Sequence, residues 1–294
     1  MDSSAFSLTA HAKVNLALHV TGQRDDGYHL IESLVAFTDF GDQISAELAD
    51  ENSFEIYGPF ANALHSDQSN NLIIKARDAL VEFAKDKGLP TAPVSIRCEK
   101  NLPVASGLGG GSTDAAAALN ILIKLWVLDI SDEDLTKIAL SLGADVPMCL
   151  KSQPLIATGI GEDIKLVTPF PQSNIVLVNP MVEVSTPVVF KALQTKQNAP
   201  LSSNFKINSF DQLLSVIEQN RNDLQIPAIS HCSEISDCLD ALLQTNPACA
   251  RMSGSGASCF ALYENKTDAL NAKKMIADNH PDWFVQSTHL LGRE

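Results

Sequence analysis

The residue types that could do chemistry are densest in residues 103–113, which read PVASGLGGGST. Four of the five residues 107–111 are glycine, and because glycine lacks a Cβ atom, the backbone there can turn several N–H groups toward one point. The alanine-rich residues 115–126 are predicted to form a helix, so these N–H groups would lie at its N-terminus, which favours an anion. We expect a polyphosphate to bind through Pro103, Val104, Ala105, Ser106, Gly107, Leu108, Gly109, Gly110, Gly111, Ser112 and Thr113.

Two common nucleotide-binding loops do not fit this segment. A P-loop would close with Gly-Lys-Ser or Gly-Lys-Thr, and that triplet is missing. A dinucleotide-binding fold would need an acidic residue about 20 positions onward at the end of the next strand, whereas the acidic residues between 129 and 134 begin a helix. An ordinary glycine-rich turn before a helix stays open as an alternative, although Ser112 and Thr113 at the helix start favour the phosphate site.

A carboxylate and a lysine could supply proton transfer and charge balance. Asp145 follows a predicted helix, and a solvated turn aspartate is its ordinary interpretation. However, Val146, Pro147 and Met148 indicate that the chain returns directly to the core, where a carboxylate can take a proton from a substrate hydroxyl. Lys13 could pair with this carboxylate or with phosphate oxygens, the alternative being a surface lysine.

A second glycine loop and two aromatic residues are further candidates. The loop precedes a predicted strand and could donate more backbone N–H groups to phosphate, the alternative being a tight turn. Tyr28 and Phe190 could stack on a planar base, although Phe190 could equally pack in the core. The residues of the second loop are Ser253, Gly254, Ser255 and Gly256.

The elements that must position these side chains can be predicted from periodicity and capping residues. Residues 6–20 alternate between apolar and polar types, which predicts a strand, or two strands joined by a bend, with Lys13 and Asn15 on its polar side. The other expected strands are residues 34–40, 43–48 after a break at Gly41-Asp42, 94–99, 155–158, 175–179 and 259–263. The expected helices begin at a cap at Asn70 or Asn71 and end near 87, and otherwise span residues 115–126, 131–142, 186–193, 210–219, 233–244 and 267–279. Residues 194–208 are expected to form a loop.

Composition bounds the class of protein. With 294 residues and 45% hydrophobic content, the chain can form two lobes, and we place its domains at residues 1–165 and 166–294. The net charge of −14 argues against a nucleic-acid partner, because binding a phosphate backbone needs a basic face. There is no C-x-x-C pair among the six cysteines, which favours free thiols. Without a signal peptide or an apolar run long enough to span a membrane, we expect a cytoplasmic protein that has no membrane partner.

Together these segments resemble the GHMP small-molecule kinases, whose three signature motifs match residues 12–16, 103–114 and 251–256 in order. Further segments are similar to the branch of this family that phosphorylates the 2-hydroxyl of 4-diphosphocytidyl-2-C-methyl-D-erythritol, a cytidine diphosphate derivative of methylerythritol on the non-mevalonate route to isoprenoid precursors. These segments are residues 22–29, 141–147 and 184–190. The resemblance runs from about residue 6 to about residue 265.

The resemblance implies a fold, an activity and residue roles. The implied fold is α+β and two-lobed, with an N-terminal lobe like ribosomal protein S5 domain 2 and a C-terminal ferredoxin-like lobe. The implied activity is transfer of the γ-phosphate of ATP with Mg²⁺, with Asp145 as general base and Lys13 orienting it. Asn71 and Lys100 would lie near the adenosine. The implied contacts to the cytidylyl substrate are Asn15, Tyr28, His29, Thr186 and Phe190.

Several points stay open at this stage. The sequence does not identify the magnesium ligands, for which Ser112 is the one candidate we name, and it does not indicate an oligomeric state. A GHMP kinase for mevalonate, homoserine or a sugar is one alternative. A nucleotide-binding module without catalytic activity is another, since a fold does not determine a function.

Overall fold

The computed structural model describes residues 5–64, 70–201 and 206–293. These residues fall into two compact units that are interleaved along the chain. Unit 1 comprises Met1–Ala12, Phe40–Val104 and Gly109–Lys151, and unit 2 comprises Lys13–Asp39, Ala105–Leu108 and Ser152–Glu294. The interleaving arises because two long strands, β1 and β2, each begin in one unit and end in the other. The domain boundary at residue 165 stays a prediction.

Strands β1 (Phe6–Gln23) and β2 (His29–Leu48) pair with each other. β1 confirms the strand that alternation predicted. The prediction of two strands separated at Gly41-Asp42 is wrong, because β2 is continuous through both residues. Gly41 lies against the backbone of β1, where a Cβ atom would come within 2.1 Å of the carbonyl oxygen of Ala10. Asp42 is fully buried and hydrogen-bonded, so neither residue acts as a turn signal here.

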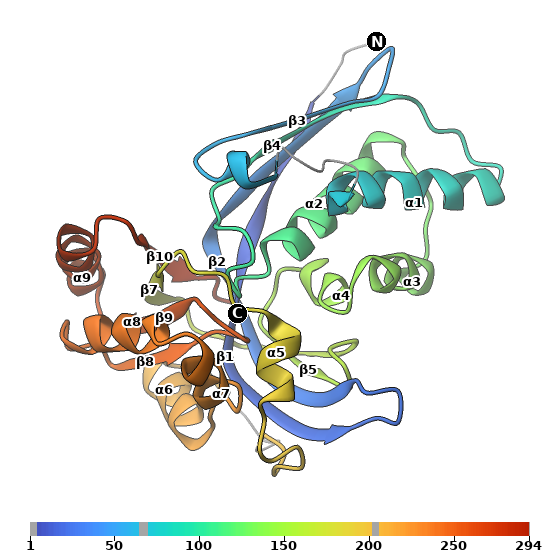
Figure 1. Cartoon of the computed structure of the whole chain (residues 1–294). Coiled ribbons are helices and arrows are strands. Elements are labelled where there is room, and N and C mark those ends of the chain that lie inside the picture. The colour runs from blue at the N-terminus through green and yellow to red at the C-terminus, as the bar shows by residue number, and fades with distance from the viewer. Residues whose placement is uncertain (1–4, 65–69, 202–205, 294) are drawn as a thin grey trace. The chain divides into compact units, whose positions relative to one another are not determined.

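Unit 1 combines a small sheet with helices. The second half of β2 pairs antiparallel with β4 (Val94–Glu99), and β3 (Ser53–Tyr57) pairs parallel with β4. The α-helices lie together beside these strands (Figure 1). They are α1 (Leu72–Asp86), α2 (Gly110–Leu125), α3 (Asp132–Leu142) and α4 (Val146–Cys149). The short 3-10 turn η1 (Ala61–Leu64) contacts β3 instead.

The N-termini of the helices in unit 1 show where capping residues predicted the start of a helix correctly. Asn71 caps α1 by accepting a hydrogen bond from the Ile73 amide at 2.9 Å, and Ser131 caps α3 in the same way through the Asp134 amide, as the sequence predicted. Helix α2 begins at Gly110 rather than at the predicted Ala115. The last glycines of the loop therefore form the first turn of the helix itself.

Unit 2 contains two groups of strands. The first half of β2 pairs antiparallel with β5 (Leu155–Thr158), which pairs with β6 (Asp163–Leu166). The remaining strands are antiparallel in the order β10, β7, β9, β8, and β10 also pairs with β2 at Leu290 and Thr38. Their bounds are β7 Ser173–Asn179, β8 Cys249–Met252, β9 Cys259–Tyr263 and β10 Phe284–Leu290.

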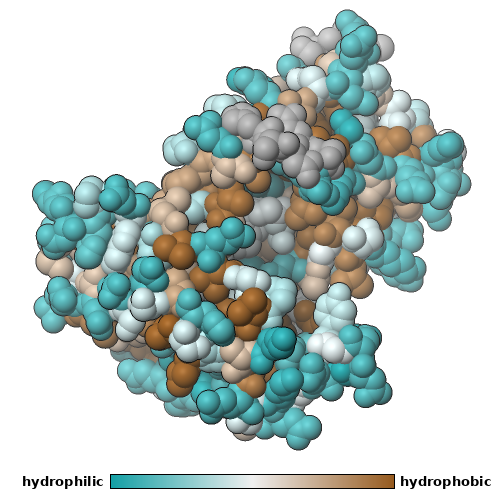
Figure 2. All heavy atoms as spheres, viewed as in Figure 1, coloured by the Kyte–Doolittle hydropathy of each residue, from teal (hydrophilic) through white to brown (hydrophobic). Residues whose placement is uncertain are grey.

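Helices cover these strands and close the core of unit 2. They are α5 (Thr186–Lys191), α6 (Phe210–Gln219), α7 (Gln225–His231), α8 (Glu234–Leu243) and α9 (Lys266–Asn279). Apolar side chains of α7, α8 and α9 pack against those of β7 and β9. The outer side of α9 is covered by hydrophilic side chains (Figure 2), as expected for a helix that buries only one face.

Most predicted elements of the second half are confirmed within one or two residues, while β3, β6, β8, β10, α4 and α7 were not predicted. The described part of the expected loop 194–208 contains neither helix nor strand, and its residues 202–205 lie outside the described residues. All six cysteines are free thiols, which confirms that expectation. Among the residues that the structure describes, none of the helices has the length and apolar character needed to cross a membrane.

Candidate active site

The N-terminus of α2 presents an open set of backbone donors in unit 1. Gly109 is the N-cap residue with φ of 68°, and no side chain caps the helix. The first turn of α2 contains no acidic residue. Because the first N–H groups of a helix have no partner within it, this end suits a phosphate group. The loop before it reaches the helix through positive φ at Ala105 (52°) and Gly107 (79°).

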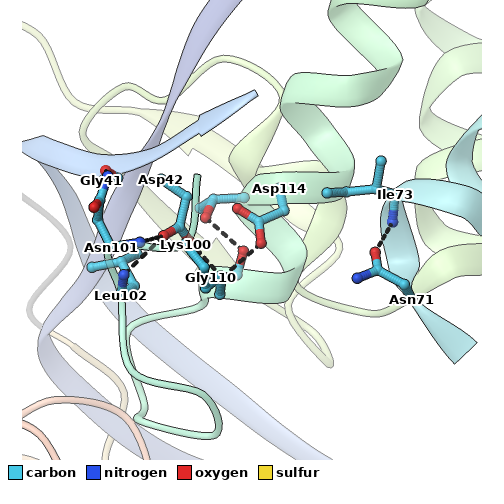
Figure 3. A network of polar contacts seen from close by, with 10 residues as sticks. Gly41, Asp42, Asn71, Ile73, Lys100, Asn101, Leu102, Gly110 and Asp114 are labelled. Carbon is cyan, nitrogen blue, oxygen red and sulfur yellow. Dashed lines mark hydrogen bonds and ion pairs between the residues drawn. The ribbon is translucent and has the colours of Figure 1, made fainter. Parts of the chain in front are cut away.

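Beside this helix end, a buried lysine lies between two buried carboxylates (Figure 3). The Lys100 Nζ lies 2.5 Å from Oδ2 of Asp42 and 2.7 Å from Oδ2 of Asp114. Asp42 also accepts hydrogen bonds from the amides of Asn101 and Leu102, at 2.5 and 2.8 Å. The cluster therefore links β2, the segment that follows β4, and α2 just before the glycine-rich loop of residues 103–113 begins.

Burial controls the charges of this cluster. It raises the pKa of the Asp114 carboxyl more than the Lys100 ammonium lowers it, and the Asp42 carboxylate raises it further. Burial alone would lower the pKa of Lys100, but the two carboxylates outweigh it and the net pKa is raised. Lys100 therefore carries a positive charge, whereas the raised pKa of Asp114 favours its protonated, neutral form. The second oxygen of Asp114, Oδ1, is buried without a hydrogen-bond partner.

Two glycines let the helix end lie close to its neighbours. A Cβ atom on Gly110 would come within 3.1 Å of the Lys100 Nζ, and one on Gly111 would lie 3.5 Å from Leu72 Cδ1 at the start of α1. The structure therefore brings Lys100 and the capped start of α1 at Asn71 into the surroundings of the α2 N-terminus (Figure 3). Their roles toward adenosine stay predictions.

In unit 2, Lys13 and Asn15 lie on β1 in a buried polar cluster. Lys13 is 5% exposed and Asn15 is 3% exposed. The Lys13 ammonium donates to Oδ1 of Asn15 at 3.2 Å, and Nδ2 of Asn15 donates to the hydroxyl of Ser33 on β2 at 2.7 Å. The Ser33 hydroxyl donates to the carbonyl oxygen of Ala17 at 2.8 Å. The polar side of β1 therefore faces the interior rather than solvent.

The second glycine loop packs against residues 105–108 of the first. The Ser253 hydroxyl accepts a hydrogen bond from the backbone N–H of Asn15 at 3.0 Å and donates one to the carbonyl oxygen of Gly107 at 3.2 Å. A Cβ atom on Gly107 would come within 2.6 Å of the Gly256 carbonyl oxygen, so the two backbones touch there. The Lys13 amide donates to the Leu108 carbonyl at 2.9 Å. Within unit 2, the two glycine loops and Lys13 thus form one continuous backbone assembly.

The residues predicted to contact a cytidylyl substrate gather in unit 2. The rings of His29 and Phe190 stack, with centroids 4.8 Å apart and planes inclined by 28°. Tyr28 is 59% exposed. The hydroxyls of Thr186 and of Ser255 in the second loop are hydrogen-bonded to each other at 2.7 Å. Burial, aided by the charge of Lys196, lowers the pKa of His29, so its ring is neutral near pH 7.

Two features of this aromatic group bear on binding. Nε2 of His29 is buried without a hydrogen-bond partner, which leaves a polar group for a ligand to satisfy. Phe190 already stacks on His29, whereas the sequence predicted that Tyr28 and Phe190 would stack on a planar base. That arrangement stays a prediction.

Asp145 lies in unit 1 between α3 and α4. It is the N-cap residue of α4, and its side chain makes no capping hydrogen bond. The residues of α4, Val146 to Cys149, are all buried, which confirms that the chain turns into the core directly after Asp145. The catalytic role of Asp145 stays a prediction.

Three residues of these clusters received no role from the sequence: Ser33, Asp42 and Asp114. The signals were weak: apolar runs follow Ser33 and Asp114, whereas Asp42 lies between Gly41 and Gln43. Such positions are buried only when a hydrogen bond or a charge compensates. The compensating partners come from distant segments, so no local pattern identified them.

The comparisons with known proteins agree with this geometry. The family model described as GHMP kinases N terminal domain matches residues 71–153, and the one described as GHMP kinases C terminal matches residues 198–282. The chain belongs to the GHMP kinase family and is a small-molecule kinase. The expected α+β GHMP fold is thereby confirmed.

Relatives of high identity cover the whole chain. A 4-diphosphocytidyl-2-C-methyl-D-erythritol kinase of Mesorhizobium japonicum is 48% identical, covering 100% of this chain and 99% of the relative. The enzyme of the same name from Agrobacterium fabrum is 47% identical over 96% of this chain and 95% of the relative.

Solved structures give the same picture of the fold. A crystal structure of 4-(cytidine 5'-diphospho)-2C-methyl-D-erythritol kinase matches with a TM-score of 0.78 at 28% identity, covering 98% of this chain and 100% of that one. A homoserine kinase from Cytophaga hutchinsonii matches with a TM-score of 0.70 at 16% identity, covering 100% of this chain and 97% of that one. The second match supports the fold alone.

Proposed function

We propose that this kinase transfers the γ-phosphate of ATP to the 2-hydroxyl of 4-diphosphocytidyl-2-C-methyl-D-erythritol, a step toward isoprenoid precursors. The observation that carries the proposal is the stacked pair of His29 and Phe190, with an unsatisfied buried nitrogen on His29. A flat ring with hydrogen-bonding edges, such as cytosine, matches both properties. Support comes from relatives of that name that are 47–48% identical along almost the whole chain.

The proposed ATP site is the glycine-rich start of α2. Its uncapped N–H groups would hold the phosphates, with Pro103 to Thr113 around them. Asn71 and Lys100 would lie toward the adenosine. In this proposal the cluster of Lys100, Asp42 and Asp114 keeps the loop in the shape that the phosphates require.

Magnesium fits this site as an ion held largely by the phosphates. The described residues contain no group of three or more His, Cys, Asp or Glu side chains that could hold a metal on their own. Mg²⁺ bound to phosphates commonly keeps few protein ligands, and Ser112 in the first turn of α2 is the residue that would reach it. When bound, the ion would neutralise charge on the phosphates.

The chemistry proposed for this chain is an in-line displacement. The 2-hydroxyl oxygen forms a bond to the γ-phosphorus, and the bond from that phosphorus to the leaving ADP oxygen breaks. The hydroxyl proton passes to the carboxylate of Asp145, and the ammonium of Lys13 balances the developing negative charge. Most of the work is positioning and charge stabilisation, which the buried clusters supply.

Removal of the exposed aromatic ring tests the assigned substrate side. Tyr28→Ala should raise the KM for the cytidylyl substrate by roughly 10-fold or more, because stacking on a base contributes about 1–3 kcal/mol. The KM for ATP should stay unchanged. Tyr57→Ala, on β3, is a matched control because Tyr57 is also exposed, at 39%, and has no assigned role. Equal changes in both KM values in the Tyr28 variant would contradict the assignment.

A further inference from the structure

Ser33 occupies a position that determines how Lys13 is held. We infer that Ser33 is a positioning residue. Its hydroxyl determines the orientation of the side-chain amide of Asn15, and that side-chain amide in turn determines the position of the Lys13 ammonium. The inference rests on the proposed role of Lys13 in phosphate transfer. All three side chains belong to unit 2 and are almost completely buried.

The partners of the Ser33 hydroxyl determine the direction of its hydrogen bonds. Its hydroxyl lies 2.8 Å from the carbonyl oxygen of Ala17, which can only accept. A serine hydroxyl has one hydrogen to donate, and this contact uses it. The 2.7 Å contact between Ser33 and Asn15 must therefore be donated by Nδ2 of Asn15.

The geometry of the Asn15 side-chain amide links Ser33 to Lys13. With Nδ2 directed to Ser33, Oδ1 of Asn15 faces the Lys13 ammonium at 3.2 Å. An ammonium group has donors only, so it needs an oxygen at this position. If the amide were rotated by half a turn, two donors would face each other and the ammonium would have to move. The hydroxyl of Ser33 selects the productive orientation.

Burial makes this relay effective. Ser33 is 0% exposed, and its neighbours Leu34 to Phe37 on β2 are fully buried apolar residues. Water is therefore poorly placed to replace a lost hydroxyl, and hydrogen bonds in such surroundings are strengthened. The Ser33 backbone is fixed as well, because it pairs with Ala157 of β5. The direction of its side chain is thus set by the sheet.

The backbone of Lys13 and Asn15 is anchored separately. The backbone N–H of Lys13 donates to the carbonyl oxygen of Leu108, and the backbone N–H of Asn15 donates to the hydroxyl of Ser253. Strand β1 is therefore hydrogen-bonded to both glycine loops. Loss of the Ser33 hydroxyl leaves these bonds in place. The effect of the loss is therefore expected on the Lys13 ammonium rather than on the fold of the loops.

The test compares Ser33→Ala with Ser33→Thr. Ser33→Ala should lower kcat by roughly 10- to 100-fold, since a misplacement of about 1 Å can cost about 100-fold, and should leave the KM for ATP unchanged. Ser33→Thr keeps the hydroxyl and should restore most of kcat. Ser173→Ala, the loss of another buried hydroxyl in unit 2, is the control that should leave kcat unchanged. If Ser33→Ala does not fold, Ser33→Cys takes its place, because a thiol is a weaker donor and acceptor.

A double-mutant cycle with Lys13→Met separates this inference from the proposed function. If Ser33 acts through Lys13, the double variant should be no slower than Lys13→Met alone. A large loss in Lys13→Met together with full kcat in Ser33→Ala would overturn the inference and leave the proposed function intact. Full kcat in Lys13→Met would overturn the proposed role of Lys13 and the inference together. Losses that simply multiply would contradict action through Lys13.

Discussion

Lys100, Asp42 and Asp114 form a buried cluster with one more acidic than basic group. Removing one partner of such a cluster is costly, because it leaves a buried charge without compensation. The raised pKa of Asp114 relieves this excess, since a neutral carboxyl no longer repels Asp42. The charge of this cluster thus depends on pH, and the cluster lies beside the glycine-rich start of α2.

This dependence predicts a measurable change of stability with pH. The pKa of Asp114 is about 8 in the folded protein, whereas an aspartate in an unfolded chain has a pKa of about 3.9. Between these values the folded protein binds a proton that the unfolded chain has released, so the free energy of unfolding falls as pH rises.

Asp114→Asn cannot ionise and should remove this slope. Its free energy of unfolding, measured by denaturant titration between about pH 5 and pH 8, should decline less than that of the wild type, by up to about 1.4 kcal/mol per pH unit. Parallel curves for the two proteins would show that Asp114 does not carry the effect.

Asp145 carries the proton-transfer step of the proposed mechanism. Asp145→Asn should lower kcat by about 10²- to 10⁴-fold, because an amide cannot accept the hydroxyl proton. ATP affinity, measured by nucleotide titration, should barely change. Asp50→Asn, at an exposed aspartate in the turn after β2, is the control. Turnover like that of the wild type in the Asp145 variant would remove this residue from the mechanism.

At the scale of elements, the sequence predicted those whose signals are local. Caps at Asn71 and Ser131 located two helices, and alternation located β1. Sequence signals failed where packing determines the structure. β2 continues through Gly41-Asp42 because a glycine fits against Ala10 and because Asp42 accepts a hydrogen bond from the backbone N–H of Asn101. Helix α2 starts inside the glycine loop for a similar reason, since Gly110 fits beside Lys100.

The C-terminus of α2 holds Val127 in an unfavourable backbone conformation. This C-terminus has the hydrogen bonds of a Schellman motif, from the Leu128 amide to Ile123 and from the Val127 amide to Lys124. This motif places Val127 at φ of 52°, in the left-handed region that a β-branched residue avoids. Val127 is also 87% exposed, so its side chain contributes little packing.

Val127→Gly should therefore raise the free energy of unfolding by about 1 kcal/mol, because glycine adopts this conformation without strain. The opposite control is Val81→Gly inside α1, which should lower stability by a similar amount. Both are measured by denaturant unfolding. A Val127→Gly variant with unchanged or lower stability would contradict this account of the helix end.

At the scale of the whole molecule, motifs identified candidate residues, but the sequence could not predict how distant segments combine. Asn15 and Ser253 are hydrogen-bonded although 238 positions separate them, and Ser33 joins the same cluster. Lys13, Asn15 and the glycine loops were recognised by residue type and order. Ser33, Asp42 and Asp114 have hydrogen-bond partners that only the folded chain brings together. The sequence likewise did not predict that the two compact units alternate along the chain.

The acidic character of the molecule agrees with the kind of site that it contains. Because the chain has a net charge of −14, we propose that backbone N–H groups and buried lysines hold the phosphate. The first turn of α2 contains no acidic residue, which favours an anion at this helix end. A small phosphorylated ligand can be bound in this way without a basic surface.

The central claim is the identity of the phosphate acceptor. It is tested most directly by following transfer of label from γ-labelled ATP to 4-diphosphocytidyl-2-C-methyl-D-erythritol, mevalonate and homoserine in parallel, with the purified full chain. We expect labelled product with the cytidylyl substrate, phosphorylated at its 2-hydroxyl, and none above background with the other two. Faster transfer to mevalonate or homoserine, or no transfer to any acceptor, would contradict it.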